Sequence, residues 1–263
     1  MIAQNNSKSA DVARKLFEAR VQKTPVQQLS KAGIQLSRLE AYAVQEAGIL
    51  LRKTEKENCI GIKMGLTSEG KRRQMNLDSP LYGELTDRMQ IKNEAHFEMA
   101  QLIHPKIEPE VAFLISKTLS GDVTREEVLA ACDGVCACME ILDSRYEEFK
   151  YFSMEDVIAD NSSSSHFVLG PWIKNFHEID LKELKMEMSI DGKIVQEGIS
   201  KEISGDPVQS VIELCRLLAT RNRKLLAGTI VLAGAATAAV EMKPGQKIKL
   251  IVESLPAVSI SIV

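Results

Sequence analysis

Apolar residues recur at helical spacing at the start of the chain and at strand spacing over most of the rest. Residues 9–22 and 36–52 carry apolar positions three and four apart, which predicts two amphipathic helices. A polar connector follows at residues 52–58, after which the strand pattern begins. In the second helix, the stripe predicted to face the core consists of Leu36, Leu39, Ala43, Ala47 and Leu50.

The strand pattern is clearest in "KMEMSIDGKIVQEG" (185–198). Met186 and Met188 fall on one face of the first half, and polar residues fall on the other. The central Asp191-Gly192 pair is a strong hairpin signal, because both residues tolerate the positive φ of a tight turn. Further strands are predicted at residues 59–66, 229–233, 247–252 and 258–263.

Two helices are predicted to interrupt the strands. Thr124 and Glu127 have the spacing of a capping box, and Asp206 followed by Pro207 is typical of a helix start.

The chain is therefore predicted to have an α+β fold. It divides into a small helical N-terminal region at residues 1–79 and a larger, mostly β domain at residues 80–263. The charged segment 67–79 is expected to be a mobile lid, because it has little apolar content to anchor it.

Composition argues against several classes of protein. The 263 residues are 44% hydrophobic and carry a net charge of −3, without the basic stripe and interleaved aromatics of a nucleic-acid surface. No apolar run reaches the roughly 18 residues that a membrane span needs, and "MIAQNNSKSADVARK" lacks the apolar core of a signal peptide. We therefore expect a cytoplasmic protein without membrane or nucleic-acid partners. The odd number of cysteines, five, argues against a disulfide framework.

An acidic pair enters an apolar strand in "LIHPKIEPEVAFLI" (102–115). Glu108 and Glu110 are two residues apart, so both point to one face, and the residues after them are apolar on both faces. Glu140 is a third acid in an apolar run, "VCACMEIL". Three such carboxylates suit Mg²⁺ or Mn²⁺. Salt bridges are an equal alternative from spacing alone, with Lys63, Lys106 or Arg145 as the counter-ions.

Other polar residues have two interpretations each. Lys63 in "GIKMG" is either a snorkelling edge lysine or an acid–base group at a pocket. The segment "ADNSSSSHF" (159–167) is either a solvated turn or a source of donors to a ligand carboxylate. Thr237, among the small residues 232–240, is favoured as core packing, although the segment permits close backbone approach.

Five blocks in order resemble a known family. They are "GIKMGLTS", "LIHPKIEPEVAF", "MEILDSRYEEFKY", "VIADNSSSSHFVLG" and "AGTIVLAGAATAAVEMKPGQKI". Together they resemble the 4-oxalocrotonate decarboxylase and 2-keto-4-pentenoate hydratase group of the fumarylacetoacetate hydrolase superfamily, from about residue 8 to the end. One departure is "AGAAT" (233–237), where members often have "TGGIT".

The resemblance implies a mixed β-roll over residues 80–263 that serves as the catalytic domain. It implies Mg²⁺ or Mn²⁺ on Glu108, Glu110 and Glu140, with Lys63 and Leu81 as catalytic residues. It also implies a dicarboxylic keto acid as substrate, held by Asn161, Ser163, Ser164 and Thr237. A homo-oligomer and a complex with vinylpyruvate hydratase are further expectations.

The residue at position 81 distinguishes the decarboxylases of the group from the hydratases. Hydratases tend to have an aspartate at this position, in "PDYG" or "PDFG", whereas this chain reads "SPLYGEL". The resemblance thus favours decarboxylation of 4-oxalocrotonate in the meta-cleavage catabolism of aromatic compounds. The alternatives are hydration of 2-keto-4-pentenoate and, in another class, a non-catalytic partner that stabilises a hydratase.

Overall fold

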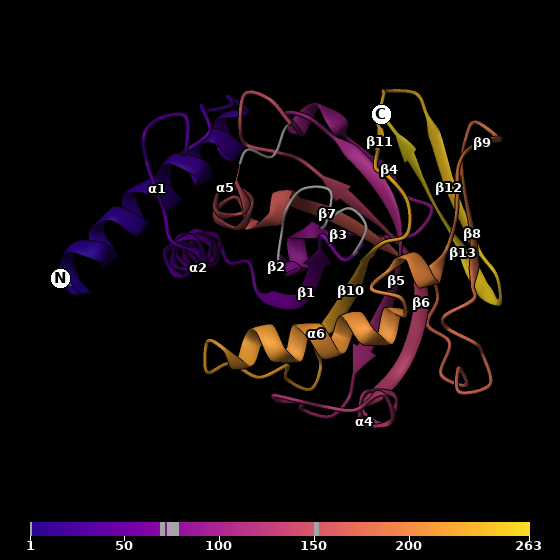
Figure 1. Cartoon of the computed structure of the whole chain (residues 1–263). Helices are drawn as coiled ribbons and strands as arrows, with labels where there is room; N and C mark the ends of the chain where they lie inside the picture. Colours follow the sequence, from indigo (N-terminus) through magenta and orange to yellow (C-terminus); the bar gives the residue numbers. More distant parts are fainter. Residues whose placement is uncertain (1, 69–71, 73–78, 150–152) are drawn as a thin grey trace.

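The computed structural model describes residues 2–68, 72, 79–149 and 153–263, with side chains from Lys8 onward. Two sheets lie side by side, with helices around the larger one (Figure 1). This is the predicted α+β fold. The α-helices are α1 (Ile2–Gln22), α2 (Arg38–Thr54), α4 (Arg125–Ala130), α5 (Met154–Ala159) and α6 (Pro207–Ala219). The short 3₁₀ helices are η1 (Asp87–Met89), η2 (Met99–Gln101), η3 (Asn161–Ser163) and η4 (Ser200–Glu202).

The larger sheet mixes parallel and antiparallel strands. Its order is β2-β1-β10-β5-β6-β7-β3, with β11 also paired to β5. Strands β1 and β10 are parallel, whereas β5 is antiparallel to both β10 and β6. The strands are β1 (Cys59–Gly65), β2 (Leu81–Thr86), β3 (Gln90–Ile91), β5 (Lys106–Ile115), β6 (Cys132–Leu142), β7 (Ser164–Leu169), β10 (Ile230–Ala235) and β11 (Val240–Glu241).

The second sheet has the order β4-β13-β12-β8-β9 and packs through β12 and β13 against β6. Its strands are β4 (His96–Phe97), β8 (Lys185–Ile190), β9 (Lys193–Ile199), β12 (Lys247–Val252) and β13 (Leu255–Ile262). The predicted hairpin joins β8 to β9, with positive φ at Asp191 and Gly192. Met186 and Met188 are buried, as the alternation predicted.

The helix starts follow the sequence signals. Thr124 and Glu127 form the predicted capping box of α4, and the Asp206 side chain accepts a hydrogen bond from the Val208 N–H at the start of α6. All five cysteines are free, and each except Cys59 is buried.

The stripe predicted to face the core in α2 is wrong at two positions. Leu39 and Leu50 are 68% and 60% exposed. The buried face carries Tyr42 and Gln45 instead, because the Gln45 amide donates to the carbonyl oxygens of Tyr82 and Ile158. The Oε1 atom of Gln45, in contrast, is buried without a hydrogen-bond partner among the described residues, so the hydrogen bonds of Nε2 compensate the burial of this amide only in part.

The division of the chain at residue 80 stays a prediction. Strand β1 lies before that boundary, yet it pairs with β2 and β10 in the larger sheet. Most of the predicted lid, 67–79, lies outside the described residues. Arg72 is described, and its Nη1 atom donates to the carbonyl oxygens of Leu66 and Thr67.

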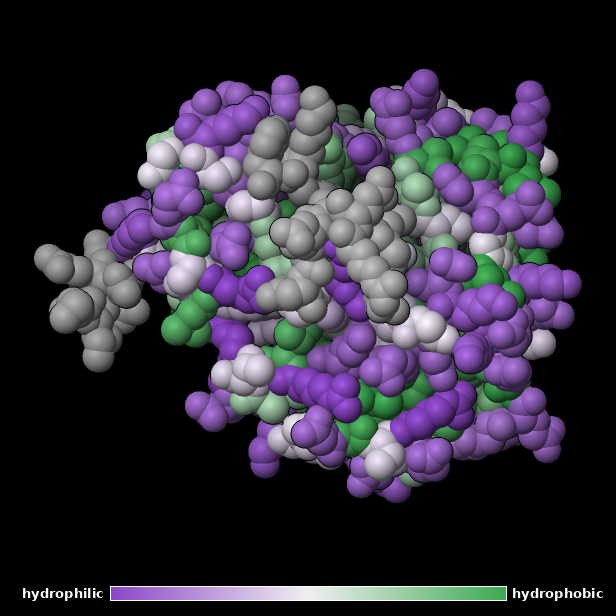
Figure 2. All heavy atoms as spheres, viewed as in Figure 1, coloured by the Kyte–Doolittle hydropathy of each residue, from purple (hydrophilic) through white to green (hydrophobic). Residues whose placement is uncertain are grey.

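Hydrophilic residues cover most of the described surface on the face seen in Figure 2. None of the helices in the described part of the chain combines the length and apolar character of a membrane span.

Candidate metal centre and its cavity

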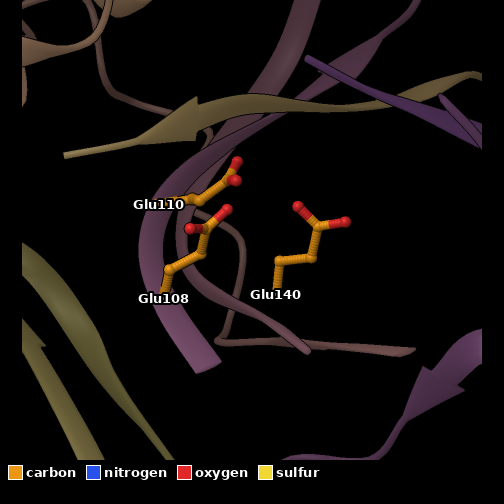
Figure 3. A group of neighbouring side chains, drawn as sticks. All are labelled: Glu108, Glu110 and Glu140. Atoms are coloured by element: carbon orange, nitrogen blue, oxygen red, sulfur yellow. The ribbon is translucent and has the colours of Figure 1, made fainter. Parts of the chain in front are cut away.

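Three glutamates converge where β5 meets β6. Glu108 lies directly opposite Glu140 in the antiparallel pair, and Glu110 follows on the same face of β5. The carboxylates of Glu108 and Glu110 project toward that of Glu140 (Figure 3), and one oxygen from each lies within 4.8 Å of the others. Like charges opposite one another destabilise a sheet, so this arrangement calls for a cation.

The burial of two of these carboxylates strengthens the argument for a bound cation. Glu110 and Glu140 are both fully buried. Burial raises the pKa of Glu110 well above its ordinary value, and the neighbouring Glu140 and Glu108 raise it further. Among the described residues, Oε1 of Glu110 and Oε1 of Glu140 find no hydrogen-bond partner. Buried oxygens without donors are what Mg²⁺ or Mn²⁺ coordinates, so the donor set fits either ion.

Lys63 gives the cluster one fixed positive charge. It lies on β1, is 2% exposed, and its Nζ atom is 3.1 Å from Oε2 of Glu140. Burial raises the pKa of Glu140, and Lys63 opposes that rise. The two alternatives from the sequence are thus compatible: Lys63 pairs with Glu140, and the other two acids of the cluster lie beside this pair. Arg145 pairs instead with Asp160.

The backbone of β10 orients Glu110. Gly234 has a φ of +107° at a bulge in β10, and its N–H donates to Oε2 of Glu110 at 2.7 Å. A Cβ atom at this position would lie 2.5 Å from Oγ1 of Thr67. Glycine is therefore required twice, by the backbone conformation and by the close approach of Thr67.

A cavity of about 270 Å³ opens beside the glutamates. Its lining includes Lys63, Lys106, Glu108 and the fully buried Leu81. Leu81 is the register partner of Gly65, and a Cβ on that glycine would lie 2.9 Å from its Cδ1. Leu81 is thus a fixed apolar part of the wall of the cavity that Glu108 also lines.

None of the four residues predicted to hold substrate is among the described residues that line this cavity, and their polar groups differ in their hydrogen bonding. Both polar groups of the Asn161 side chain bond to the backbone of Glu84, so they brace β2. Ser164 has a buried Oγ without a hydrogen-bond partner among the described residues. Ser163 is buried, and Thr237 donates to the Ala238 carbonyl oxygen. Their predicted roles stay predictions.

Ser162 and Phe149 are among the lining residues that the sequence reasoning missed. Ser162 belongs to a run of three left-handed residues, 161–163, with φ between 50° and 57°. Asparagine tolerates this conformation, and serine much less so. The polar run was visible in the sequence, but the turn that brings Ser162 to the cavity depends on the contact with β2.

The fold and the acidic centre define a class of proteins. A family model described as "Fumarylacetoacetate (FAA) hydrolase C-terminal" matches residues 84–263, and the chain belongs to this family. A 4-oxalocrotonate decarboxylase of Pseudomonas sp is 41% identical, covering 97% of this chain and 98% of that protein. A 2-hydroxyhexa-2,4-dienoate hydratase of Comamonas testosteroni is 34% identical over 84% of each.

A solved structure agrees with these relatives. The 4-oxalocrotonate decarboxylase of Pseudomonas putida G7, complexed with magnesium and adipate, superposes with a TM-score of 0.93. It is 33% identical and covers 98% of both chains.

Proposed function

We propose that this chain is a metal-dependent decarboxylase that converts 4-oxalocrotonate (2-oxohex-3-enedioate) to 2-hydroxypenta-2,4-dienoate and CO₂. The observation that carries the proposal is the cluster of Glu108, Glu110 and Glu140 at a cavity whose wall includes Leu81. The decarboxylase relative, similar over nearly the whole of both chains, supports it.

The reaction breaks one carbon–carbon bond without a nucleophile. When the bond between C5 and C6 breaks, its electron pair delocalises through the double bond onto the 2-oxo oxygen. Mg²⁺ or Mn²⁺ held by the three glutamates would supply Lewis-acid stabilisation at that oxygen. One proton then completes the dienol product.

The residues of this chain have separate roles in that scheme. Lys63 lines the cavity with its ammonium next to Glu140, so it can hydrogen-bond the substrate or donate the proton. Leu81 presents an apolar wall, where an aspartate would add a negative charge beside a dianionic substrate. Ser164, and less directly Asn161, Ser163 and Thr237, are candidates to hold the 2-oxo carboxylate.

Two alternatives differ in what they predict. Hydratase relatives at about one-third identity keep hydration of 2-keto-4-pentenoate as the second candidate. A non-catalytic role, as a stabilising partner of a vinylpyruvate hydratase, is the candidate of another class. The paired Lys63 and Glu140 and the convergent acids disfavour a degenerate subunit. A homo-oligomer, such a hydratase complex and a cytoplasmic location remain proposals.

One assay separates the three. The purified chain with Mg²⁺ is given 2-oxohex-3-enedioate in one arm and 2-hydroxypenta-2,4-dienoate in the other. We expect CO₂ release in the first arm, little water addition in the second, and a sharp loss of decarboxylation in Leu81→Asp. Efficient hydration with no CO₂ would establish the hydratase function, and inactivity in both arms would favour the non-catalytic role.

A further inference from the structure

Lys106 is a second lysine in the lining of the cavity, and its surroundings differ from those of Lys63. It is half-buried at the start of β5, and its Nζ atom lies 4.4 Å from the centroid of the Phe149 ring. A ring face attracts an ammonium and fixes its position. Because the ring has no lone pair, however, the three N–H donors of the ammonium still need acceptors.

The position of Lys106 on β5 gives it a defined distance from the metal centre. It precedes Glu108 by two residues, so both side chains leave the same face of the strand. Two strand residues span about 7 Å. An extended six-carbon chain with bonds of about 1.5 Å spans about 6 Å between its terminal carbons. A six-carbon diacid with one end at the glutamates therefore reaches the lysine with the other.

Among the described residues, no carboxylate forms a described ion pair with this lysine. Glu241 is its register partner on β11, but the described ion pairs do not include Lys106, and Glu241 is exposed. The ammonium of Lys63 is engaged by Glu140. Of these two lining lysines, Lys106 is the one whose charge the described ion pairs leave for a ligand.

We propose that Lys106, held against the ring of Phe149, is the subsite for the distal carboxylate of a dicarboxylic substrate. The inference rests on the proposed function, and it names the residue that distinguishes a diacid from a monoacid of the same length. The contact is strongest before reaction. As the C5–C6 bond breaks, the carboxylate loses its charge and leaves as neutral CO₂, so the contact weakens along the reaction.

This behaviour predicts a separation of kinetic effects. A contact that favours bound substrate more than the transition state lowers KM without raising kcat. Replacing Lys106 with Met keeps the length of the side chain and removes its charge. In Lys106→Met, we expect KM for the dicarboxylate to rise far more than kcat falls.

The decisive measurement is direct binding, which is independent of turnover. Calorimetry on the Mg²⁺-loaded full chain compares adipate with hexanoate, which have the same length and differ by one carboxylate. A hydrogen bond to a charged group is worth roughly ten- to a hundred-fold in affinity. We expect wild type to prefer adipate by about that factor and Lys106→Met to lose the preference, while both bind hexanoate alike.

Matched variants complete the test. Lys249→Met removes an exposed lysine from β12 and should leave both affinities unchanged. Lys106→Arg should retain part of the preference, and Phe149→Leu should reduce it.

The outcomes divide cleanly. Loss of the adipate preference alone supports the subsite. A retained preference in Lys106→Met overturns it, and so does an equal loss of hexanoate binding, which would show a general role in positioning. If the preference depends on Lys106 but no CO₂ is released from 4-oxalocrotonate, the subsite stands and the proposed function fails. If CO₂ is released but the adipate preference does not depend on Lys106, the proposed function stands and the subsite is refuted.

Discussion

Glu110 is the residue on which the need for a cation is greatest. One of its oxygens accepts the Gly234 N–H, and the other is buried without a hydrogen-bond partner among the described residues. Two further acids lie within reach of it. In the absence of a cation, its ionised form is destabilised by burial and by its neighbours together, which is why its pKa rises.

Replacing this residue should therefore have opposite effects on function and stability. In Glu110→Gln we expect decarboxylation with Mg²⁺ to fall at least about 100-fold, because a ligand is lost. Urea unfolding of the metal-free protein should show equal or higher stability, by about 1–2 kcal/mol, because a buried charge is removed. Glu187→Gln, on an exposed position of β8, is the control for both measurements. Full activity in Glu110→Gln would remove this residue from the metal centre.

At the scale of elements, the bulge in β10 connects the sheet to the metal centre. The register of β10 against β5 shifts between Leu232 and Ala235, and Gly234 lies in that shift with its N–H turned to Glu110. Thr67, just after β1, packs against the same glycine. Gly234 thus positions both Glu110, a candidate metal-ligating residue on β5, and Thr67, which follows β1.

A methyl group at this position should disturb both. We expect Gly234→Ala to lower stability by about 2–3 kcal/mol, combining backbone strain with the clash against Thr67, and to weaken Mg²⁺ binding measured by calorimetry. Gly121→Ala is the matched control: its φ is also positive, at +73°, but no atom lies within 4 Å of the added carbon. It should lose about 1 kcal/mol and leave metal binding unchanged. Equal effects of the two changes would mean that only backbone strain operates.

At the scale of the whole molecule, the N-terminal helices meet the larger sheet across a charged junction. A cavity of about 380 Å³ lies there, lined by Arg20 of α1, Arg52 of α2 and His166 of β7 among others. Burial, and then the charges of Arg52 and Arg20, lower the pKa of His166 to about 4. The folded state therefore prefers neutral His166, whereas the unfolded chain binds its proton near the ordinary value of 6.5.

This difference predicts how stability depends on pH. The stabilising contribution of neutral His166 is complete above about pH 6.5 and is lost as pH falls toward about 4. Because the side chain is partly exposed, we expect the loss to be about 1–2 kcal/mol. Urea unfolding of wild type and His166→Gln from pH 7.5 to 4 isolates this contribution, since other groups titrate in both proteins. If the stability of the two proteins changed with pH in parallel, the titration of His166 would make no contribution to stability.

The sequence predicted correctly the features that depend only on neighbouring residues, namely strand alternation and helix caps. Alternation along β5 placed Glu108 and Glu110 on one face, because the period of a strand is two whatever surrounds it. The caps of α4 and α6 were readable for the same reason. The exposed Leu39 and Leu50 show the limit: which face of a helix is buried depends on its neighbours, and here Gln45 finds two carbonyl acceptors inside.

The remaining features of the site depend on residues far apart in the chain. The convergence of Glu140 with the other two acids requires the pairing of β6 with β5, and the sequence left a metal and salt bridges equally open. The hydrogen bond from Gly234 to Glu110 spans 124 positions in the chain. No pattern within either segment predicts such a contact.

The strand order also has a consequence for synthesis on the ribosome. Strands β5 and β6, with all three glutamates, are translated well before β10, and in the described sheet β10 is what joins β1 to β5. A nascent chain that stops before Ile230 therefore holds three acids without the Gly234 N–H and without Lys63 docked opposite Glu140. Pairing between segments so distant in the chain is slow to form. The contacts of Gly234 and Lys63 with the metal centre therefore form only after β10 has been made, and a prematurely terminated product carries the three acids without these contacts.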